Sequence, residues 1–141
     1  MKVLLLDDDQ SFRTLTAATV RQAGHDVVEA DTAAAALRLL RDDMGIGVVV
    51  MELLLRDGEI TGPEFMLLHS LRGNHQGLIV LSRDARGLVL DEIARIARGS
   101  DCELHAVIPR NDVLRTLPRR LSQLAMDGIL AGEQAARNGG A

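Results

Sequence analysis

The sequence predicts a doubly wound α/β protein with a five-stranded parallel sheet. Short, wholly apolar runs alternate five times with segments of helical periodicity, which is typical of strands and crossover helices. The apolar runs lack the in–out alternation of a half-exposed sheet, so we expect helices on both faces. At 141 residues the chain has the length of one domain.

Five apolar segments are the expected strands, and each ends at a polar or turn-forming residue. They are residues 3–6, 27–30, 46–51, 78–81 and 104–108. The first stops at three consecutive aspartates and the third stops at Glu52. Runs of this length and composition suit strands that are buried on both faces.

Helical periodicity fills the segments between the strands. Asp9 or Ser11 is a suitable N-cap for the first helix, and Gly24 suits the left-handed residue that ends it. Thr32 is the expected cap of the second helix. Pro63 suits the first turn of the third helix, and a fourth helix is expected before the fifth strand.

The last helix is marked by apolar residues on one face: Val113, Leu117, Leu121 and Leu124. Pro118 leaves two alternatives, because either the helix begins late and the proline falls in its first turn, or the helix is kinked there. After Gly128 the composition turns to Gly, Ala and polar residues. We therefore predict a folded domain over residues 1–126 and a flexible tail over residues 127–141.

The composition excludes several classes of function. Sixteen Lys and Arg against twenty Asp and Glu give a net charge of −4, which is unsuited to non-specific binding of nucleic acid. There is no Trp or Tyr on which bases or a flavin ring would stack. Cys102 is the single cysteine and cannot form an internal disulfide. With no signal peptide or membrane span in the sequence, we expect a cytoplasmic protein that binds neither nucleic acid nor membranes.

Acidic residues follow two of the predicted strands. In a sheet of order 2-1-3-4-5 the strand order reverses between strands one and three, and ligands bind at the carboxyl ends there. Asp7, Asp8 and Glu52 stand at those ends. Two carboxylates about 4 Å apart repel by about 4 kcal/mol at an effective dielectric near 20. Such a cluster must bind a divalent cation such as Mg²⁺, recruit a basic side chain, or keep a proton.

Several motifs, taken in order, resemble the receiver domain of bacterial response regulators, which has the flavodoxin-like fold. The strand Leu-Leu-Leu that ends in Asp7-Asp8-Asp9, with Arg13 shortly after, resembles the opening of that domain. Residues 24–30 resemble its second strand, and residues 78–82 resemble its fourth strand, which ends in Ser or Thr. Ile108-Pro109 stands where the family has Lys-Pro. The resemblance runs from residue 2 to about residue 125.

The resemblance implies a role for each matching position. In receiver domains an Asp on strand three accepts a phosphoryl group from a histidine kinase, and an acidic pair on strand one helps to hold Mg²⁺. A hydroxyl residue, an aromatic residue and a Lys then respond to the phosphoryl group. The matching residues are Asp7 and Asp8 for the metal, Glu52 for the acceptor, and Ser82, His105 and Ile108 for the switch.

Three of these positions depart from the family pattern. Glu52 places its carboxylate one methylene further out than Asp would. Where catalysis depends mainly on positioning, a misplacement near 1 Å lowers the reaction rate about a hundredfold. Ile108 lacks the ammonium group of the family's Lys, and His105 replaces the aromatic residue. The missing positive charge is available from three arginines: Arg56, Arg83 and Arg110.

We interpret the chain as an atypical receiver module that acts by protein–protein interaction, without phosphorylation and without enzymatic turnover. Glu52 is then either a remnant of lost chemistry or a permanent mimic of the phosphorylated state. The expected interface is formed by the fourth helix, the fifth strand and the fifth helix. A histidine kinase or an output protein is the expected partner, and a homodimer is a further alternative. The arginines at positions 115, 119 and 120 are interpreted as a solvated helix face.

One alternative belongs to a different class of protein. A strand that ends in Asp7-x-Asp9 also resembles Mg²⁺-dependent phosphohydrolases with an aspartyl nucleophile. Ser11 occupies the position where that family has Thr or Val. That family also requires a Lys near the nucleophile, whereas the one Lys of this chain is Lys2, at the start of the first strand.

Overall fold

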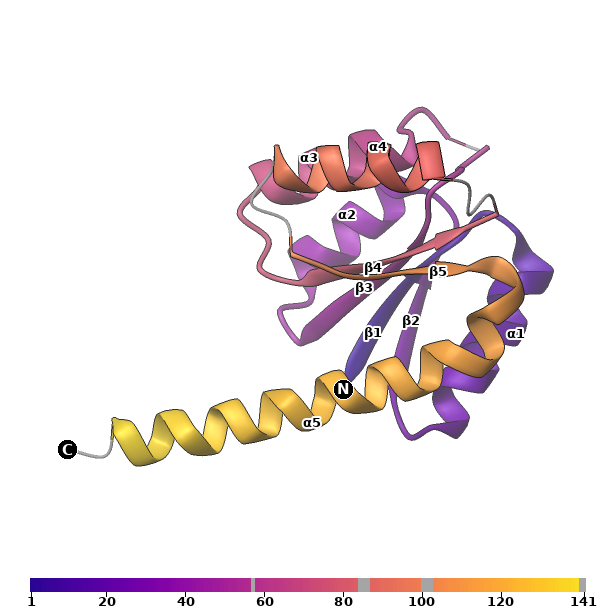
Figure 1. Cartoon of the computed structure of the whole chain (residues 1–141). Coiled ribbons are helices and arrows are strands. Elements are labelled where there is room, and N and C mark those ends of the chain that lie inside the picture. The colour runs from indigo at the N-terminus through magenta and orange to yellow at the C-terminus, as the bar shows by residue number, and fades with distance from the viewer. Residues whose placement is uncertain (57, 84–86, 100–102, 140–141) are drawn as a thin grey trace.

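The computed structural model describes residues 1–56, 58–83, 87–99 and 103–139, without the side chains of residues 87–90 and 130. Strands and helices alternate along the whole chain (Figure 1). In order they are β1 (Lys2–Leu6), α1 (Gln10–Gln22), β2 (Asp26–Ala30), α2 (Ala33–Asp42), β3 (Ile46–Glu52), α3 (Gly62–Leu71), β4 (Gly77–Ser82), α4 (Gly87–Arg98), β5 (Leu104–Pro109), a 3-10 turn (Arg110–Asp112) and α5 (Val113–Asn138). The predicted fold class is confirmed, and each strand lies within a few residues of its predicted range.

The five strands form one sheet in the order β2-β1-β3-β4-β5, and all neighbouring strands are parallel. The carboxyl ends of β1 and β3 therefore lie side by side, with Leu6 paired to Met51. The strand order reverses at this pair, as the sequence predicts. Among the described residues, no helix is both long enough and apolar enough to cross a membrane.

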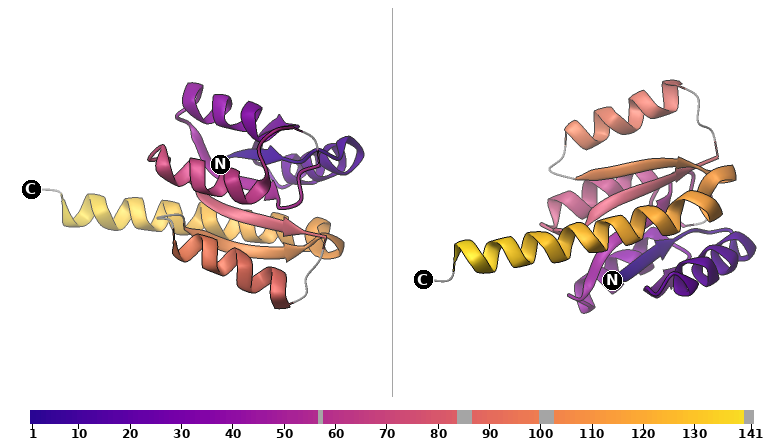
Figure 2. Two further views of the ribbon diagram at one scale, coloured as in Figure 1. Left: turned by 90° about the horizontal axis from the view of Figure 1, so that it is seen from above. Right: turned by 60° about the horizontal axis from the view of Figure 1, so that its bottom comes forward.

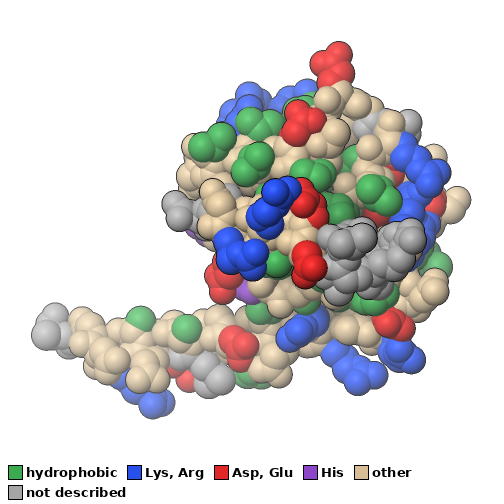
Figure 3. Space-filling view, turned by 45° about the horizontal axis from the view of Figure 1, so that its top comes forward, with side chains coloured by type: hydrophobic (Ala, Val, Ile, Leu, Met, Phe, Trp, Pro, Cys, Tyr) green, Lys and Arg blue, Asp and Glu red, His purple; other side chains and the backbone are tan. Residues whose placement is uncertain are grey.

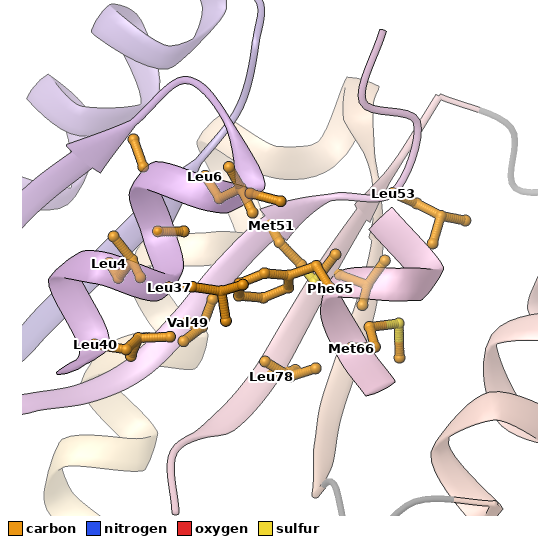
Figure 4. Close-up of a cluster of buried hydrophobic side chains, with 14 of the residues drawn as sticks. Leu4, Leu6, Leu37, Leu40, Val49, Met51, Leu53, Phe65, Met66 and Leu78 are labelled. Carbon is orange, nitrogen blue, oxygen red and sulfur yellow. The ribbon is translucent and has the colours of Figure 1, made fainter. Parts of the chain in front are cut away.

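Helices cover both faces of the sheet (Figures 1 and 2). On one face, side chains of α2, α3 and α4 pack on alternate residues of β1, β3 and β4, with Phe65 and Leu40 among the largest fully buried groups (Figure 4). On the other face, α1 and α5 pack on the intervening residues, including Leu5 and Val50. Burial on both faces explains why the strands are wholly apolar in sequence.

Side-chain caps mark where three of the helices begin, and the sequence predicts two of them, at Asp9 and Thr32. Asp9, and not Ser11, caps α1, because its carboxylate accepts a hydrogen bond from the backbone N–H of Phe12 at 3.1 Å. Thr32 caps α2 as predicted. Thr61 caps α3 in a reciprocal arrangement with Glu64, in which each side chain accepts from the other residue's N–H.

Helix α5 differs from the expectation at two points. Pro118 lies inside the helix beyond its first turn, so the alternative of a late helix start is wrong. The helix also continues through the segment for which we predicted a flexible tail, as far as Asn138. Ala, Glu and Gln are good helix formers, and they maintain the helix despite Gly128 and Gly132.

Gly62 is required by a close approach between α3 and the end of β3. A Cβ at this position would lie 2.0 Å from the carbonyl oxygen of Leu53. Because the obstacle is backbone, no rotamer change relieves it, and we expect Gly62→Ala to reduce the free energy of unfolding by about 1–3 kcal/mol. Gly132→Ala is the matched control, because no atom lies within 4 Å of its Cβ position. This change inside a helix should stabilise by about 0.5–1 kcal/mol. Urea unfolding measures both, and equal effects would contradict the packing argument.

Candidate functional site

The three predicted carboxylates lie together at the carboxyl ends of β1 and β3. Asp7 directly follows β1, and Glu52 is the last residue of β3. Both are fully buried, and the side chain of Asp8 is only 5% exposed. The parallel register between β1 and β3 brings these residues together although about 45 positions separate them in the chain.

Backbone groups satisfy only part of this buried charge. One carboxylate oxygen of Asp7 accepts the N–H of Asp9 at 2.9 Å, and one oxygen of Glu52 accepts the N–H of Leu54 at 3.3 Å. The second oxygens, Oδ2 of Asp7 and Oε2 of Glu52, are buried and accept no hydrogen bond from the described residues. Burial raises the pKa of Asp7, and it raises the pKa of Glu52 to about 7. The neighbouring Asp7 raises the pKa of Glu52 further, against the N–H of Leu54 and the nearby arginines.

Arg83 is the arginine that enters the acidic cluster. It follows Ser82 at the end of β4, and its guanidinium group lies 3.7 Å from Oδ1 of Asp8 and 3.8 Å from Oε1 of Glu52. Its side chain is 20% exposed, so the group lies between the buried acids and the solvent. The sequence left three candidates for the compensating charge, and the structure places Arg83 against both strands of the switch point.

The other two arginines act at the rim of the cluster. Arg56 contributes its backbone N–H, which donates to Oδ2 of Asp8 at 2.6 Å. Arg110 pairs with Asp9, and its guanidinium carbon lies 4.0 Å from the centre of the Phe12 ring. The helix-capping hydrogen bond from Phe12 and the pairing with Arg110 lower the pKa of Asp9. Asp8, Asp9, Arg56 and Arg83 line an open pocket of about 240 Å³.

Arg13 contributes to the site in a way that sequence reasoning missed. In the sequence, Arg13 stands out only as part of the motif that follows the three aspartates. In the structure its side chain bends back to donate to the backbone carbonyl of Asp7 at 2.6 Å and lies 3.2 Å from a carboxylate oxygen of Glu29. Its position one turn after the capping Asp9 was the available signal, because residues four apart share a helix face.

The structure separates the three switch-equivalent residues. Ser82 is buried at the end of β4, one residue beyond the Leu81 that pairs with Glu52. Ile108 is 3% exposed and packs in the core on the α1–α5 face, where it brings no charge to the acids. His105 lies near the start of β5, where its ring occupies the space beside Gly77 at the start of β4. It is therefore at the opposite end of the strands from Ser82.

The described residues do not fit a Mg²⁺ site. Mg²⁺ requires several oxygen ligands in near-octahedral geometry. Here the Arg83 guanidinium lies against Asp8 and Glu52, and the N–H of Arg56 already binds the second oxygen of Asp8. Within the described ranges, no three His, Cys, Asp or Glu side chains are grouped so as to hold a metal ion. A cation of the protein itself thus stands where the resemblance implied a bound metal.

Comparison with known proteins identifies the fold. No family model and no curated relative matches the sequence. The receiver domain of the Francisella response regulator 1452 matches with a TM-score of 0.75 at 20% identity, over 90% of this chain and 98% of that chain. A response regulator receiver protein from Pseudoalteromonas atlantica matches with a TM-score of 0.76 at 15% identity, over 91% and 99%. A fusion that carries the trimeric coiled coil of yeast Spc42 matches with a TM-score of 0.75 at 17% identity, over 99% and 91%.

These similarities confirm the predicted five-stranded receiver fold. The matched solved structures include response regulator receiver domains. At identities of 15–20% they show the fold alone.

Proposed function

We propose that this chain is an atypical receiver module that acts by protein–protein interaction and does not use phosphorylation of an acceptor aspartate. The observation that carries the proposal is the position of Arg83 against Asp8 and Glu52. The guanidinium offsets part of the negative charge of the acidic cluster, and a proton on Glu52, whose pKa is raised to about 7, offsets another part, so the proposed module needs neither Mg²⁺ nor a phosphoryl group at this site.

This chain also departs at two positions from what phosphoryl transfer requires. Transfer depends on positioning and on positive charge around the developing negative oxygens. Glu52 carries its carboxylate one methylene beyond the position of Asp, and Ile108 provides a buried hydrocarbon group where the receiver family has Lys. A carboxyl group whose pKa is raised to about 7 is also partly protonated near neutral pH.

The alternative of a phosphohydrolase is less favoured. The only Lys of the chain, Lys2, lies at the start of β1 and donates to Asp43 at 2.5 Å, at the end of the sheet opposite to the acids. The proposed module therefore has no enzymatic turnover and is proposed to bind a protein, with the α4–β5–α5 face as the expected contact for a kinase or an output protein.

Intact-mass analysis after incubation with Mg²⁺ and a small-molecule phosphodonor tests the proposal. We expect no change in mass, and we expect Mg²⁺ to leave the melting temperature of the wild-type protein unchanged. Arg83→Ala exposes Asp8 and Glu52 to a metal and should create a stabilisation by Mg²⁺. Arg95→Ala, which removes an exposed ion pair with Glu92 on α4, is the control and should create none. A gain of one base-labile phosphoryl group by the wild type would overturn the proposal.

A further inference from the structure

Basic side chains gather on the inner half of α5, residues 113–126, where the helix lies against the sheet (Figure 3). This half carries three arginines, at positions 115, 119 and 120, and no acidic residue. All three are exposed, as expected for a solvated helix face. The rest of the chain is acidic, since the net charge of the whole chain is −4. A local excess of positive charge on an acidic protein attracts an anionic partner.

Two of these guanidinium groups have no acidic partner within the described part of the chain. Arg115 pairs with Asp112 at 2.7 Å, about one turn before it. Arg119 and Arg120 have no acidic side chain of a described residue within 4.0 Å. The positive charge of Arg119 and Arg120 is therefore available to a ligand.

These two arginines flank a groove on the exposed surface of α5. Its volume is about 450 Å³, and it is lined by Arg115, Thr116, Arg119, Arg120 and Gln123. At about 100° per residue, Thr116 and Gln123 lie between the two arginines around the helix. They form the floor of the groove, which runs for about 10 Å along the helix axis, and the arginines form its walls. The lining thus offers positive charge and hydrogen-bond donors to a ligand.

A second groove, of about 520 Å³, continues this surface as far as Met126. It shares Arg119 and Gln123 with the first groove, and the apolar side chain of Met126 is 52% exposed beside them. Asp127 limits the basic surface at this end, because its carboxylate accepts a hydrogen bond from the amide of Gln123 at 2.8 Å. A ligand that covers both grooves therefore needs negative charge over the arginines and an apolar group over Met126.

We propose that the two joined grooves bind an acidic segment of a partner protein. Its carboxylates pair with the guanidinium groups of Arg119 and Arg120, and an apolar side chain of the same segment packs on Met126. Arginine binds carboxylates in a bidentate geometry that fixes orientation as well as adding affinity. A phosphate ion would leave the apolar groove empty, and it would find no free backbone N–H in the middle of a helix.

This assignment rests on the proposed function, because it gives the chemistry of the protein partner. The two tests nevertheless fail separately. A wild type that accepts a phosphoryl group would overturn the proposed function whether or not the groove binds an acidic peptide. A groove that binds no acidic peptide would overturn the present inference and would leave the result of the phosphorylation test unchanged.

Fluorescence anisotropy on the full chain tests the groove with a labelled peptide of Glu, Ala and Leu, in which Glu recurs at every fourth position. We expect binding at low ionic strength that is lost in about 1 M NaCl, where the screening length is about 3 Å. A peptide with Gln in place of every Glu should not bind. Arg119→Glu and Arg120→Glu should each weaken binding at least about tenfold, because attraction becomes repulsion.

Arg72→Glu is the matched control, because it changes the net charge by the same amount. Arg72 is exposed at the end of α3, on the other face of the sheet, and it has no acidic partner among the described residues. This variant should bind the acidic peptide as the wild type does.

Met126→Ser tests the apolar part of the surface. It should weaken binding of the peptide that contains Leu, and it should leave unchanged the binding of a peptide with Ala in place of Leu. The double variant Arg119→Glu with Arg120→Glu should instead bind a peptide with Lys in place of every Glu. Circular dichroism confirms that each variant is folded.

Four results would overturn the inference. The first is a wild type that binds no acidic peptide at low ionic strength. The second is equal weakening by Arg72→Glu, which would reduce the effect to net charge. The third is displacement of the peptide by inorganic phosphate at constant ionic strength, which would make the groove a simple anion site. The fourth is self-association of the wild type in sedimentation equilibrium that Arg119→Glu abolishes, which would make a second copy the occupant.

Discussion

Glu52→Gln will stabilise the protein by about 2–3 kcal/mol at pH 8.5 and will change its stability little at pH 5. Burial raises the pKa of the Glu52 carboxyl group to about 7 in the folded protein, against an ordinary value of 4.5. The folded state therefore holds the proton more tightly than the unfolded state. The resulting stability is fully present below about pH 4.5 and is lost as the pH rises through 7. Gln has the same shape without the charge, so it avoids this loss at alkaline pH.

The difference between the variant and the wild type removes the effect of titrating groups that do not interact with Glu52, whereas the buried neighbour Asp7 contributes to it. Burial lowers the pKa values of His25 and His69, so both histidines favour unfolding as the pH falls below about 6.5. Their effect is common to both proteins and cancels in the difference. Urea unfolding at pH 5, 7 and 8.5 gives the free energies. Glu92→Gln, on the exposed face of α4, is the control and should show no such trend. A Glu52→Gln effect that is equal at pH 5 and pH 8.5 would refute the argument.

The sequence is sufficient to predict the fold because each level of organisation points to the same structure. The apolar strands require two covered faces, the caps at Asp9 and Thr32 and the proline at position 63 mark the helix starts, and the switch point then follows from the strand order. The meeting of Asp7 with Glu52 is predictable for the same reason, since both residues end neighbouring parallel strands.

The remaining features depend on how far individual side chains reach and on small differences in helix propensity. Arg56, Arg83 and Arg110 all follow strands at the same edge of the sheet, and only their side-chain conformations decide which guanidinium group contacts Asp8 and Glu52. The continuation of α5 past Gly128 sets helix-forming residues against two glycines, and composition alone does not decide that balance.

Glu52→Asp alone will not make the protein an efficient phosphoryl acceptor. The shorter side chain corrects the position of the carboxylate. It leaves the Arg83 guanidinium group against Asp8, where a metal would have to bind, and it leaves Ile108 without an ammonium group. We expect the triple variant Glu52→Asp, Arg83→Ala, Ile108→Lys to be labelled by a phosphodonor with Mg²⁺ at least about a hundredfold faster than the single variant, because positioning and positive charge carry this chemistry.

Intact-mass analysis over time measures both rates, and hydroxylamine sensitivity identifies an acyl phosphate. The triple variant with Asn in place of Asp at position 52 is the control, because it keeps both charge changes and lacks the acceptor carboxylate. Rapid labelling of Glu52→Asp by itself would mean that the Arg83 guanidinium moves aside when a metal binds. The extra methylene of Glu52 would then be the one feature that prevents phosphorylation. Slow labelling of the single variant with rapid labelling of the triple variant would instead show that Arg83 and Ile108 also prevent phosphorylation of this receiver fold.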